Sequence, residues 1–524
     1  MKGLGDFTTT SRVVPITLLA AGVGTLSAFL ALTLLKMIAF FTNLFVFQRI
    51  STANVSPAGH QLGLAIVLVP IVGGLVIGLL ARFGSDKIRG HGIPEAIEAI
   101  LMRGSRVDPK VAVLKPISSA ISIGSGGPFG AEGPIIMTGG AFGSLVAQCF
   151  SLTAAERKTL LVAGAAGGMS AIFASPLAAT LLAIELLLFK WKPRSFLPVV
   201  VASATAAFLR PWLLGDGPVF PVPPHAVHPS FALVLGCVAS GLAAGALGTV
   251  LSKAIYVVED VFQKLPLHWM WWPAIGGLFI GLGGLVEPRA LGVGYDVIAS
   301  LLAGDLVGRA LVVLVVVKAT IWAISLGSGT SGGVLAPLLI MGAGLGGIEA
   351  GILPSMGVGF WPLVSMAAVL GGTMRSPMMA VVFALELTHD WAMALPLLVA
   401  VPIAYAVTVL VLERSILTEK ISRRGFHVSA EYATDPLELL FVREVMKEGP
   451  VTEETTANAD ADEPLRVAVS RMATEGTTRL TVHAAGEVVG LLTLEDALKA
   501  RVRHLEEEHR RERVFPRLRA RPAR

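Results

Sequence analysis

Two glycine-rich stretches of the same design contain the residues that could do chemistry in this chain. The first, residues 124–134, reads GSGGPFGAEGP, and the second, residues 327–337, reads GSGTSGGVLAP. Both open Gly-Ser-Gly, both have proline at the eleventh position, and they begin 203 residues apart. Glycine permits tight turns, and proline suits the first turn of a helix because its missing N–H needs no partner there. Each stretch therefore predicts a loop that leads into a helix start.

A helix start attracts anions because it presents unpaired backbone N–H groups and the positive end of the helix dipole. Glu132 lies in the first stretch and is the carboxylate of that predicted helix start. An ordinary first-turn carboxylate stabilised by the dipole is one interpretation. If the stretch lies inside a membrane, such a group is costly and functional by default, which favours a role for Glu132 in an anion path.

The elements that must position these stretches have the composition of membrane helices. Hydrophobic residues make up 54% of the 524 residues, charged residues only 15%, and the mean hydropathy is +0.72. Soluble proteins carry about 25% charged residues. Several nearly uncharged windows approach the length that spans a bilayer, and others are interrupted by glycine or proline, as in transporters. Examples of the nearly uncharged windows are residues 13–35, 62–80, 231–251, 272–286 and 363–382.

The remaining bulk properties exclude other classes of protein. Cys149 and Cys237 stand in apolar stretches, which indicates neither a disulfide framework nor a metal site, and no cofactor is expected. The first apolar run lacks a small-residue cleavage pattern, so we expect an uncleaved first helix. Basic residues gather in short connectors and at the C-terminal end. This pattern predicts cytoplasmic connectors and termini and no nucleic-acid partner.

A second pair of segments supports an internal duplication. Phe-Ala-Ser-Pro at 173–176 begins an apolar run that ends at Glu185, and Met-Arg-Ser-Pro at 374–377 begins one that ends at Glu386. Each glutamate follows its proline by nine residues, and the prolines are 201 residues apart. We therefore expect two halves, about 15–210 and 230–425, with a site at their interface.

Four motifs together resemble the CLC family of chloride channels and chloride/proton antiporters. They are Gly-His-Gly-Ile-Pro at 90–94, Gly-Ala-Glu-Gly-Pro at 130–134, Gly-Gly-Val-Leu-Ala-Pro at 332–337 and Met-Arg-Ser-Pro…Glu-Leu-Thr at 374–388. The resemblance implies an all-α integral membrane protein, built as an inverted repeat of many tilted, broken helices. It also implies a homodimer with one pore per subunit, in which three helix starts share a central anion site.

Residue roles follow from the same resemblance. The family's gating glutamate falls on Glu132, and a family lysine falls on Lys115. Glu185 is a further possible site residue. The implied anion-binding set comprises His91, Gly92, Ile93, Gly130, Ala131, Glu132, Gly133, Val334, Leu335, Ala336 and Leu417.

The chain departs from the family pattern at five of these or neighbouring positions. His91 replaces a serine, Ala131 an arginine, Leu335 a phenylalanine and Leu417 a pore-lining tyrosine, while Leu186 stands where antiporters carry an inner glutamate. Two hydroxyl groups that usually contact the anion are therefore missing. We expect binding to depend on backbone N–H groups and on His91, unless His91 only faces a wet vestibule.

Three of the remaining charged residues have simpler interpretations. Lys115 is either a site residue or a lysine of a cytoplasmic loop near the membrane surface. Glu185 and Glu386 are expected to cap or pair at helix ends rather than to carry protons. The sequence has neither a His-Glu-x-x-His motif nor a phosphate-binding lysine loop, and it is not expected to be an enzyme.

Leu186 decides between the two transport classes at this stage. Proton movement needs titratable groups or water chains, and the usual inner relay is absent. The sequence therefore favours a voltage- or pH-gated chloride channel. The alternative is a chloride/proton antiporter whose proton route does not need a glutamate at position 186.

Past residue 425 the chain becomes more charged. Predicted strands at 479–483 and 488–492, a turn at Gly486 and the ending Thr-Leu-Glu-Asp at 493–496 resemble a CBS module. We expect a small α/β CBS-like cytoplasmic domain over 426–505, serving mainly to stabilise a dimer, with only weak adenine-nucleotide binding. Residues 506–524 are expected to form a basic tail that touches anionic lipid. The whole is expected to lie in a bacterial inner (plasma) membrane.

Overall fold

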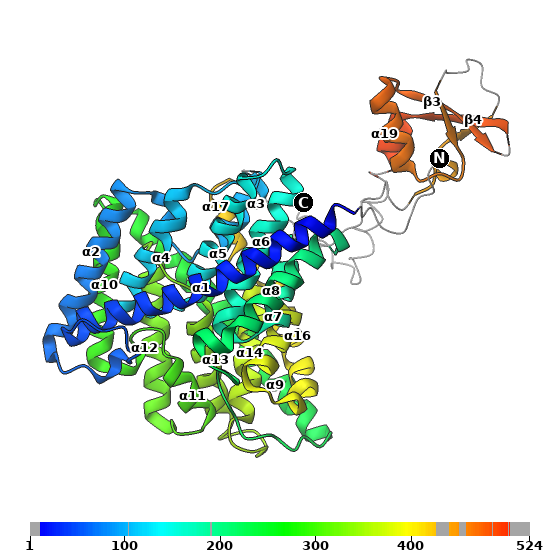
Figure 1. Ribbon diagram of the computed structural model, residues 1–524. Coiled ribbons are helices and arrows are strands. Elements are labelled where there is room, and N and C mark those ends of the chain that lie inside the picture. Colours follow the sequence, from blue (N-terminus) through cyan, green and yellow to red (C-terminus); the bar gives the residue numbers. More distant parts are fainter. Residues whose placement is uncertain are drawn as a thin grey trace, which may run out of the picture. The chain divides into compact units, whose positions relative to one another are not determined.

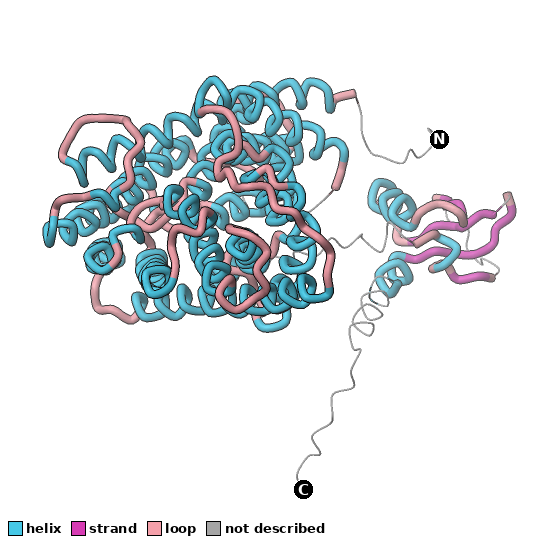
Figure 2. The backbone as a smooth tube through the Cα atoms, turned by 90° about the horizontal axis from the view of Figure 1, so that it is seen from below, coloured by secondary structure: helices cyan, strands magenta, loops and turns pink. Residues whose placement is uncertain are grey.

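The computed structural model describes residues 11–102, 104–188, 191–425, 440–449, 457–484, 486–500 and 502. The chain divides into two units, Met1–Ala430 and Glu431–Arg524. The first consists of helices and loops, and the second contains a small sheet (Figure 2). The predicted basic tail, 506–524, lies outside the described residues.

The helices of the larger unit fall into two halves joined by a long connection after residue 214 (Figure 1). The first half contains α1 (Val13–Phe47), α2 (Leu68–Phe83), α3 (Ile93–Met102), α4 (Pro109–Gly124), α5 (Glu132–Gln148), α6 (Ala154–Phe173), α7 (Pro176–Leu182), the π-helical turn η4 (Ala183–Leu188) and α8 (Pro193–Leu214). The second half contains α9 (Phe231–Gln263), α10 (Trp272–Val286), α11 (Tyr295–Leu302), α12 (Gly308–Gly327), α13 (Leu335–Glu349), α14 (Phe360–Met374), α15 (Pro377–Thr388), α16 (Ala394–Val411) and α17 (Thr418–Arg423).

Within the described residues, seven helical segments are long and apolar enough to cross a membrane. They are Val13–Phe47, Gly63–Phe83, Pro193–Leu214, Phe231–Gln263, Trp269–Val286, Gly308–Gly327 and Trp391–Val411. The nearly uncharged window 363–382 is divided between α14 and α15. Arg375 adopts φ +57°, which ends α14, and Pro377 starts the separate helix α15. Residue Ala174 breaks the first half in the same way, with φ +53°.

The halves repeat the same packing. In the first, α1 packs on α6 and α8, and α5 packs on α6. In the second, α9 packs on α14 and α16, and α13 packs on α14. Two further pairs join the halves, α2 with α10 and α7 with α15, and Figure 1 shows α2 beside α10. The predicted duplication is thus present as an inverted repeat.

Each half caps a helix of the other through a glutamate. Glu185 accepts the Ser376 hydroxyl and the backbone N–H groups of Met378 and Met379 at the start of α15. In return, Glu386 accepts two backbone N–H groups at the start of α7, with distances of 3.0 and 2.8 Å. The expected capping role of both glutamates is therefore present. A carboxylate is favourable there because a helix start carries unpaired N–H groups and positive dipole.

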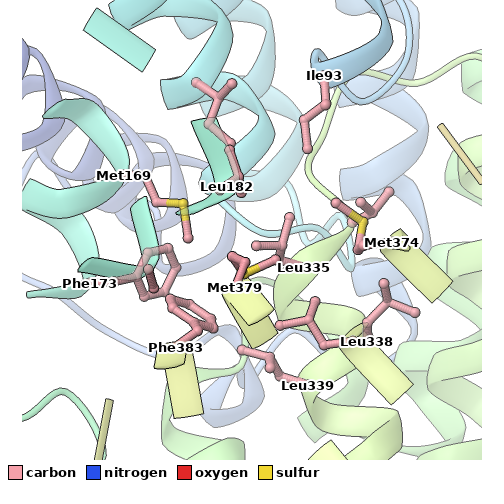
Figure 3. Packing of buried hydrophobic residues seen from close by; sticks show 14 of the residues in the cluster. Ile93, Met169, Phe173, Leu182, Leu335, Leu338, Leu339, Met374, Met379 and Phe383 are labelled. Carbon is pink, nitrogen blue, oxygen red and sulfur yellow. The ribbon is translucent and has the colours of Figure 1, made fainter. Parts of the chain in front are cut away.

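Large apolar side chains from both halves fill the space around the start of α13. Figure 3 shows Phe173 of the first half against Phe383 of the second, with ring centroids 5.1 Å apart and the planes nearly perpendicular. Leu335 lies among side chains of both halves in the same view, and it is fully buried. The packing therefore holds helix starts from the two halves in fixed positions.

The smaller unit is a four-stranded sheet in the order β1-β4-β3-β2, with β1 (Lys447–Glu448), β2 (Asn458–Asp460), β3 (Arg479–Ala484) and β4 (Glu487–Thr493). Helix α19 (Leu465–Glu475) packs on β3. The two strands predicted here are confirmed, and they form an antiparallel pair. The unit has its own core, which includes Leu465, Leu480 and Leu492. Its resemblance to a CBS module stays a prediction.

Candidate functional site

The two glycine-rich loops meet backbone to backbone in the interior of the helical unit. The N–H of Gly130 donates to the carbonyl of Gly333 at 3.2 Å, and the N–H of Gly333 donates to the carbonyl of Gly130 at 2.9 Å. A Cβ on Gly133 would lie 1.9 Å from the carbonyl oxygen of His91, so the third loop is equally close. Only glycine permits such approaches, and they bring the starts of α3, α5 and α13 together.

Glu132, the first residue of α5, sits at this meeting point and is fully buried. Its Oε1 accepts a hydrogen bond from the hydroxyl of Tyr295 at 3.4 Å. Its Oε2 has no hydrogen-bond partner among the described residues. Cβ atoms on Gly130 and Gly333 would lie 1.6 and 2.9 Å from this oxygen, so the glycines make room for the carboxylate.

The arrangement lets a negatively charged group lie among donors that carry no full charge. Helix starts stabilise an anion through N–H groups and dipoles, and they bind it weakly enough for release. A carboxylate and a small inorganic anion have similar demands on such a position. Glu132 therefore occupies a place that an anion could take.

Two cavities approach this point from different loops. One, of about 530 Å³, is lined by His91 together with the basic side chains of Arg89, Lys420, Arg423 and Arg424. The other, of about 560 Å³, is lined by Tyr295, Lys36, Arg210 and Asp296, among others. The elements that carry the two mouths lie at different ends of the helical unit, α3 and α17 at one and α11 at the other (Figure 1).

His91 precedes α3 and is buried, with 3% of its surface exposed. Its Nδ1 is buried without a hydrogen-bond partner in the described part of the chain. The loop is held in place by Glu95, whose Oε2 accepts the N–H of Gly92 at 2.9 Å and whose Oε1 pairs with Lys420 at 2.9 Å. An unpartnered ring nitrogen on a rigid loop at a helix start is a ready donor or acceptor for a ligand.

Lys115 lies on α4 beneath this loop and is fully buried. Its Nζ donates to the carbonyls of Ile88 at 2.8 Å and Gly90 at 2.7 Å, and to the Ser331 hydroxyl at 3.1 Å. The interpretation of Lys115 as a loop lysine at the membrane surface is therefore wrong. It links the loop before α3 to the second glycine-rich stretch and brings a positive charge close to the site.

The other predicted residues are distributed as follows. Helix starts brought together at the centre contain Gly92, Ile93, Gly130, Ala131, Gly133, Val334, Leu335 and Ala336. Leu417 is buried at the start of α17, which packs beside α3. Leu186 is buried in the π-helical turn. Glu185 is part of η4, and its carboxylate points away from this site to cap the start of α15.

Ser331 invites an enzymatic interpretation because residues 329–333 read Gly-Thr-Ser-Gly-Gly, the spacing of a hydrolase nucleophile elbow. The structure places this serine before a helix in an all-helical unit, fully buried. Its hydroxyl lies within hydrogen-bond distance of Lys115, Ser118 and Ser119. The serine therefore serves the structure of the loop.

Sequence reasoning missed Glu95, Tyr295 and Lys318. Glu95 had a local signal, since a glutamate three residues after a loop glycine can cap that helix start. Tyr295 and Lys318 had only a positional signal. Tyr295 follows Gly292 as Ile93 follows Gly90, an offset of 202 residues that matches the two repeated motifs.

The fold and the crossing of helix starts define a duplicated helical membrane protein of the channel and transporter class. Residues 73–409 match the family described as voltage gated chloride channel. The H(+)/Cl(-) exchange transporter ClcA of Salmonella arizonae is 31% identical over 409 residues, covering 73% of this chain and 83% of that protein. A putative chloride channel protein of Ralstonia nicotianae, described as ClcB-like, is 28% identical over 344 residues, covering 64% of this chain and 80% of that protein.

Solved structures agree on the fold. A slow cyanobacterial Cl-/H+ antiporter superimposes with a TM-score of 0.68 at 20% identity, covering 80% of this chain and 99% of that chain. A eukaryotic CLC transporter gives 0.65 at 16% identity, covering 93% and 98%. The chain belongs to the voltage-gated chloride channel family, the CLC family, and is an integral membrane protein.

Lys115→Met should lower the free energy of unfolding by about 2–4 kcal/mol, because two buried carbonyls lose a charged donor. Lys110→Met, at an exposed lysine of the same helix, is the matched control and should change stability little. Denaturant unfolding in detergent measures both. Equal stability of the two variants would show that Lys115 does not hold the loop.

Proposed function

We propose that this protein moves chloride across the membrane in exchange for protons and that Glu132 is its gate. Relatives more than 30% identical are named as exchange transporters, which favours exchange over the passive conduction that the sequence analysis ranked first. The observation that carries the proposal is the buried Glu132 carboxylate, which lies at the meeting point of three helix starts.

The geometry suggests how one residue serves both ions. Ionised, the Glu132 carboxylate occupies the place of an anion and blocks it. Protonated, it no longer competes for the helix starts, and a chloride ion takes its place. In each cycle Glu132 carries a proton and an anion passes it. The ionised carboxylate and the anion cannot occupy the position at the same time, and this exclusion couples the two movements.

Bound chloride would rely on the backbone and on His91. The hydroxyl positions of the family pattern are His91 and Leu417, and the leucine offers no donor beyond its backbone. Backbone N–H groups at the starts of α3, α5 and α13 supply the remaining donors. Five basic and three acidic residues line the cavity beside His91, and the excess of positive charge would raise the local anion concentration.

The proton route on the side of η4 must differ from an inner glutamate at 186. Leu186 cannot carry a proton, and the Glu185 carboxylate already accepts three donors at α15. A water-filled path from the 530 Å³ cavity toward Glu132 is the route we favour. Passive conduction is the second candidate, and Leu186 is the observation that favours it.

The setting we propose follows the family pattern. The protein is a homodimer in the inner membrane of a bacterium, with both termini in the cytoplasm and anionic lipid at its basic surfaces. The smaller unit stabilises the dimer. We expect only weak adenine-nucleotide binding by that unit, since its length leaves room for one CBS-like module.

Glu132→Gln should raise or unlock chloride flux and remove its pH dependence, because glutamine has the shape of the protonated acid without its titration. Chloride efflux from reconstituted vesicles between pH 4.5 and 7.5 measures this. Glu475→Gln, at an exposed glutamate of the smaller unit, is the control. Unchanged flux and an unchanged pH response in Glu132→Gln would refute the gating role.

A proton gradient alone should drive chloride uphill in vesicles that contain the wild-type protein, because exchange couples the two movements. Chloride accumulation is followed with an electrode after a pH step, at equal chloride on both sides. Protein-free vesicles and the Glu132→Gln variant should show no accumulation. If wild-type vesicles fail to accumulate chloride while still passing it down its gradient, the protein is a channel.

His91→Phe should weaken chloride binding about three- to tenfold, because the ring is kept and its hydrogen-bonding nitrogens are lost. His91→Ser, which restores a donor, should bind like the parent. Both are measured by calorimetry in the Glu132→Gln background, with His228→Phe in an exposed loop as the control. Equal affinities in the phenylalanine and serine variants would leave His91 as a cavity-wall residue only.

A further inference from the structure

The loop before α11 is built like the loop before α3, from the other half of the chain. Lys318 on α12 is fully buried, and its Nζ donates to the carbonyls of Ala290 and Gly292, each at 2.9 Å. Lys115 holds the carbonyls of Ile88 and Gly90 in the same way. The two lysines are 203 residues apart, the same offset as the glycine-rich stretches.

Both loops are also tied to the glycine-rich stretch of the opposite half. The N–H of Gly90 donates to the carbonyl of Thr330 at 3.2 Å, and the N–H of Gly292 donates to the carbonyl of Gly126 at 3.0 Å. Each loop is therefore fixed from two sides, by a buried lysine of its own half and by a backbone bond to the other. A buried lysine near a loop is costly unless its donors are used, and here they hold the chain in place.

Tyr295, the first residue of α11, directs its hydroxyl from this second loop toward the gate. The hydroxyl lies 3.4 Å from Oε1 of Glu132. Its ring packs edge-on against Phe173 and Phe220, with centroids 6.0 Å away in each case. Packing alone would be satisfied by phenylalanine. The hydroxyl instead donates to the carboxylate of Glu132.

The same tyrosine lines the 560 Å³ cavity. Three charged residues line this cavity: the basic Lys36 and Arg210 and the acidic Asp296. Basic residues therefore outnumber acidic ones in the lining. Tyr295 therefore belongs both to the lining of this cavity and to the hydrogen bond with Glu132, which is not itself in the lining.

We propose that Tyr295, on the loop that Lys318 fixes, is the anion ligand of a second binding position between Glu132 and the 560 Å³ cavity. The hydroxyl donates to the Glu132 carboxylate when this fills the position and to a halide-sized anion when the carboxylate has left. It supplies in the second half the kind of hydroxyl donor that His91 and Leu417 do not provide. This assignment rests on the proposed gating by Glu132.

The test uses chloride binding in the Glu132→Ala background, where the carboxylate is removed and the position is open to an anion. Calorimetry on the purified full-length protein compares Glu132→Ala alone with the same variant carrying Tyr295→Phe. Phenylalanine keeps the ring packing against Phe173 and Phe220. Tyr405→Phe, on α16 and in neither cavity lining, is the matched loss of a hydroxyl.

Tyr295→Phe should weaken chloride binding about three- to tenfold, the range for loss of one long hydrogen bond to an anion, and Tyr405→Phe should leave it unchanged. Equal affinity with and without the Tyr295 hydroxyl, in a protein that binds chloride and elutes as a single species, overturns the assignment. That result leaves the gate intact, because gating is tested separately by the flux of Glu132→Gln. Failure of Glu132→Gln to change flux would overturn both.

Discussion

The close contact of two backbone loops at Gly130 and Gly333 is the constraint on which the rest of the helical unit depends. A Cβ on Gly333 would lie only 2.5 Å from the carbonyl oxygen of Gly130, so the loops can approach in this way only where glycine stands. The contact brings the starts of α5 and α13 together, and the Glu132 carboxylate lies in the space that the two glycines leave open. A charged side chain from either loop would bind an anion more tightly and release it more slowly.

The buried charges around this contact act on the loops more than on a ligand. Lys115 and Lys318 use their ammonium groups to hold carbonyls, and Glu95 holds Gly92 and Lys420. The positive potential that reaches the centre is therefore delivered by fixed, neutral N–H groups, with the full charges behind them. This arrangement suits a site that must bind and release an anion repeatedly.

Sequence patterns could predict the duplication and the central carboxylate because both depend on local features. The spacing of glycine and proline predicted the two loops, and the offsets of 203 and 201 residues predicted the two halves. The start of α15 at Pro377 was predictable as well, because the Met-Arg-Ser-Pro motif marks it, and Arg375 adopts the positive φ that ends α14. Tyr295 was missed because the second copy of its loop keeps the Gly-x-Gly spacing of residues 90–92 but replaces the residues that follow. Lys318 repeats Lys115 at the same offset of 203 residues, but a lysine within an apolar run does not by itself show which carbonyls it binds.

Local sequence patterns could not decide between chloride/proton exchange and passive chloride conduction. Leu186 removes one proton carrier, but a route made of water leaves no residue type to search for. Similarity to proteins named as exchange transporters favours exchange, because the comparison extends over 409 residues and does not depend on a single position.

The reciprocal caps of Glu185 and Glu386 have a consequence for how the protein is made. The backbone N–H of Leu177 at the start of α7 is capped by the carboxylate of Glu386, which is synthesised 209 residues later. At ordinary rates of synthesis that interval is roughly 10–40 s. During this time the nascent first half holds a helix start with unmet donors in or near the bilayer. The first half therefore leaves the ribosome without the cap of α7, which Glu386 of the second half supplies. The first half can reach its final structure only after the second half has been made.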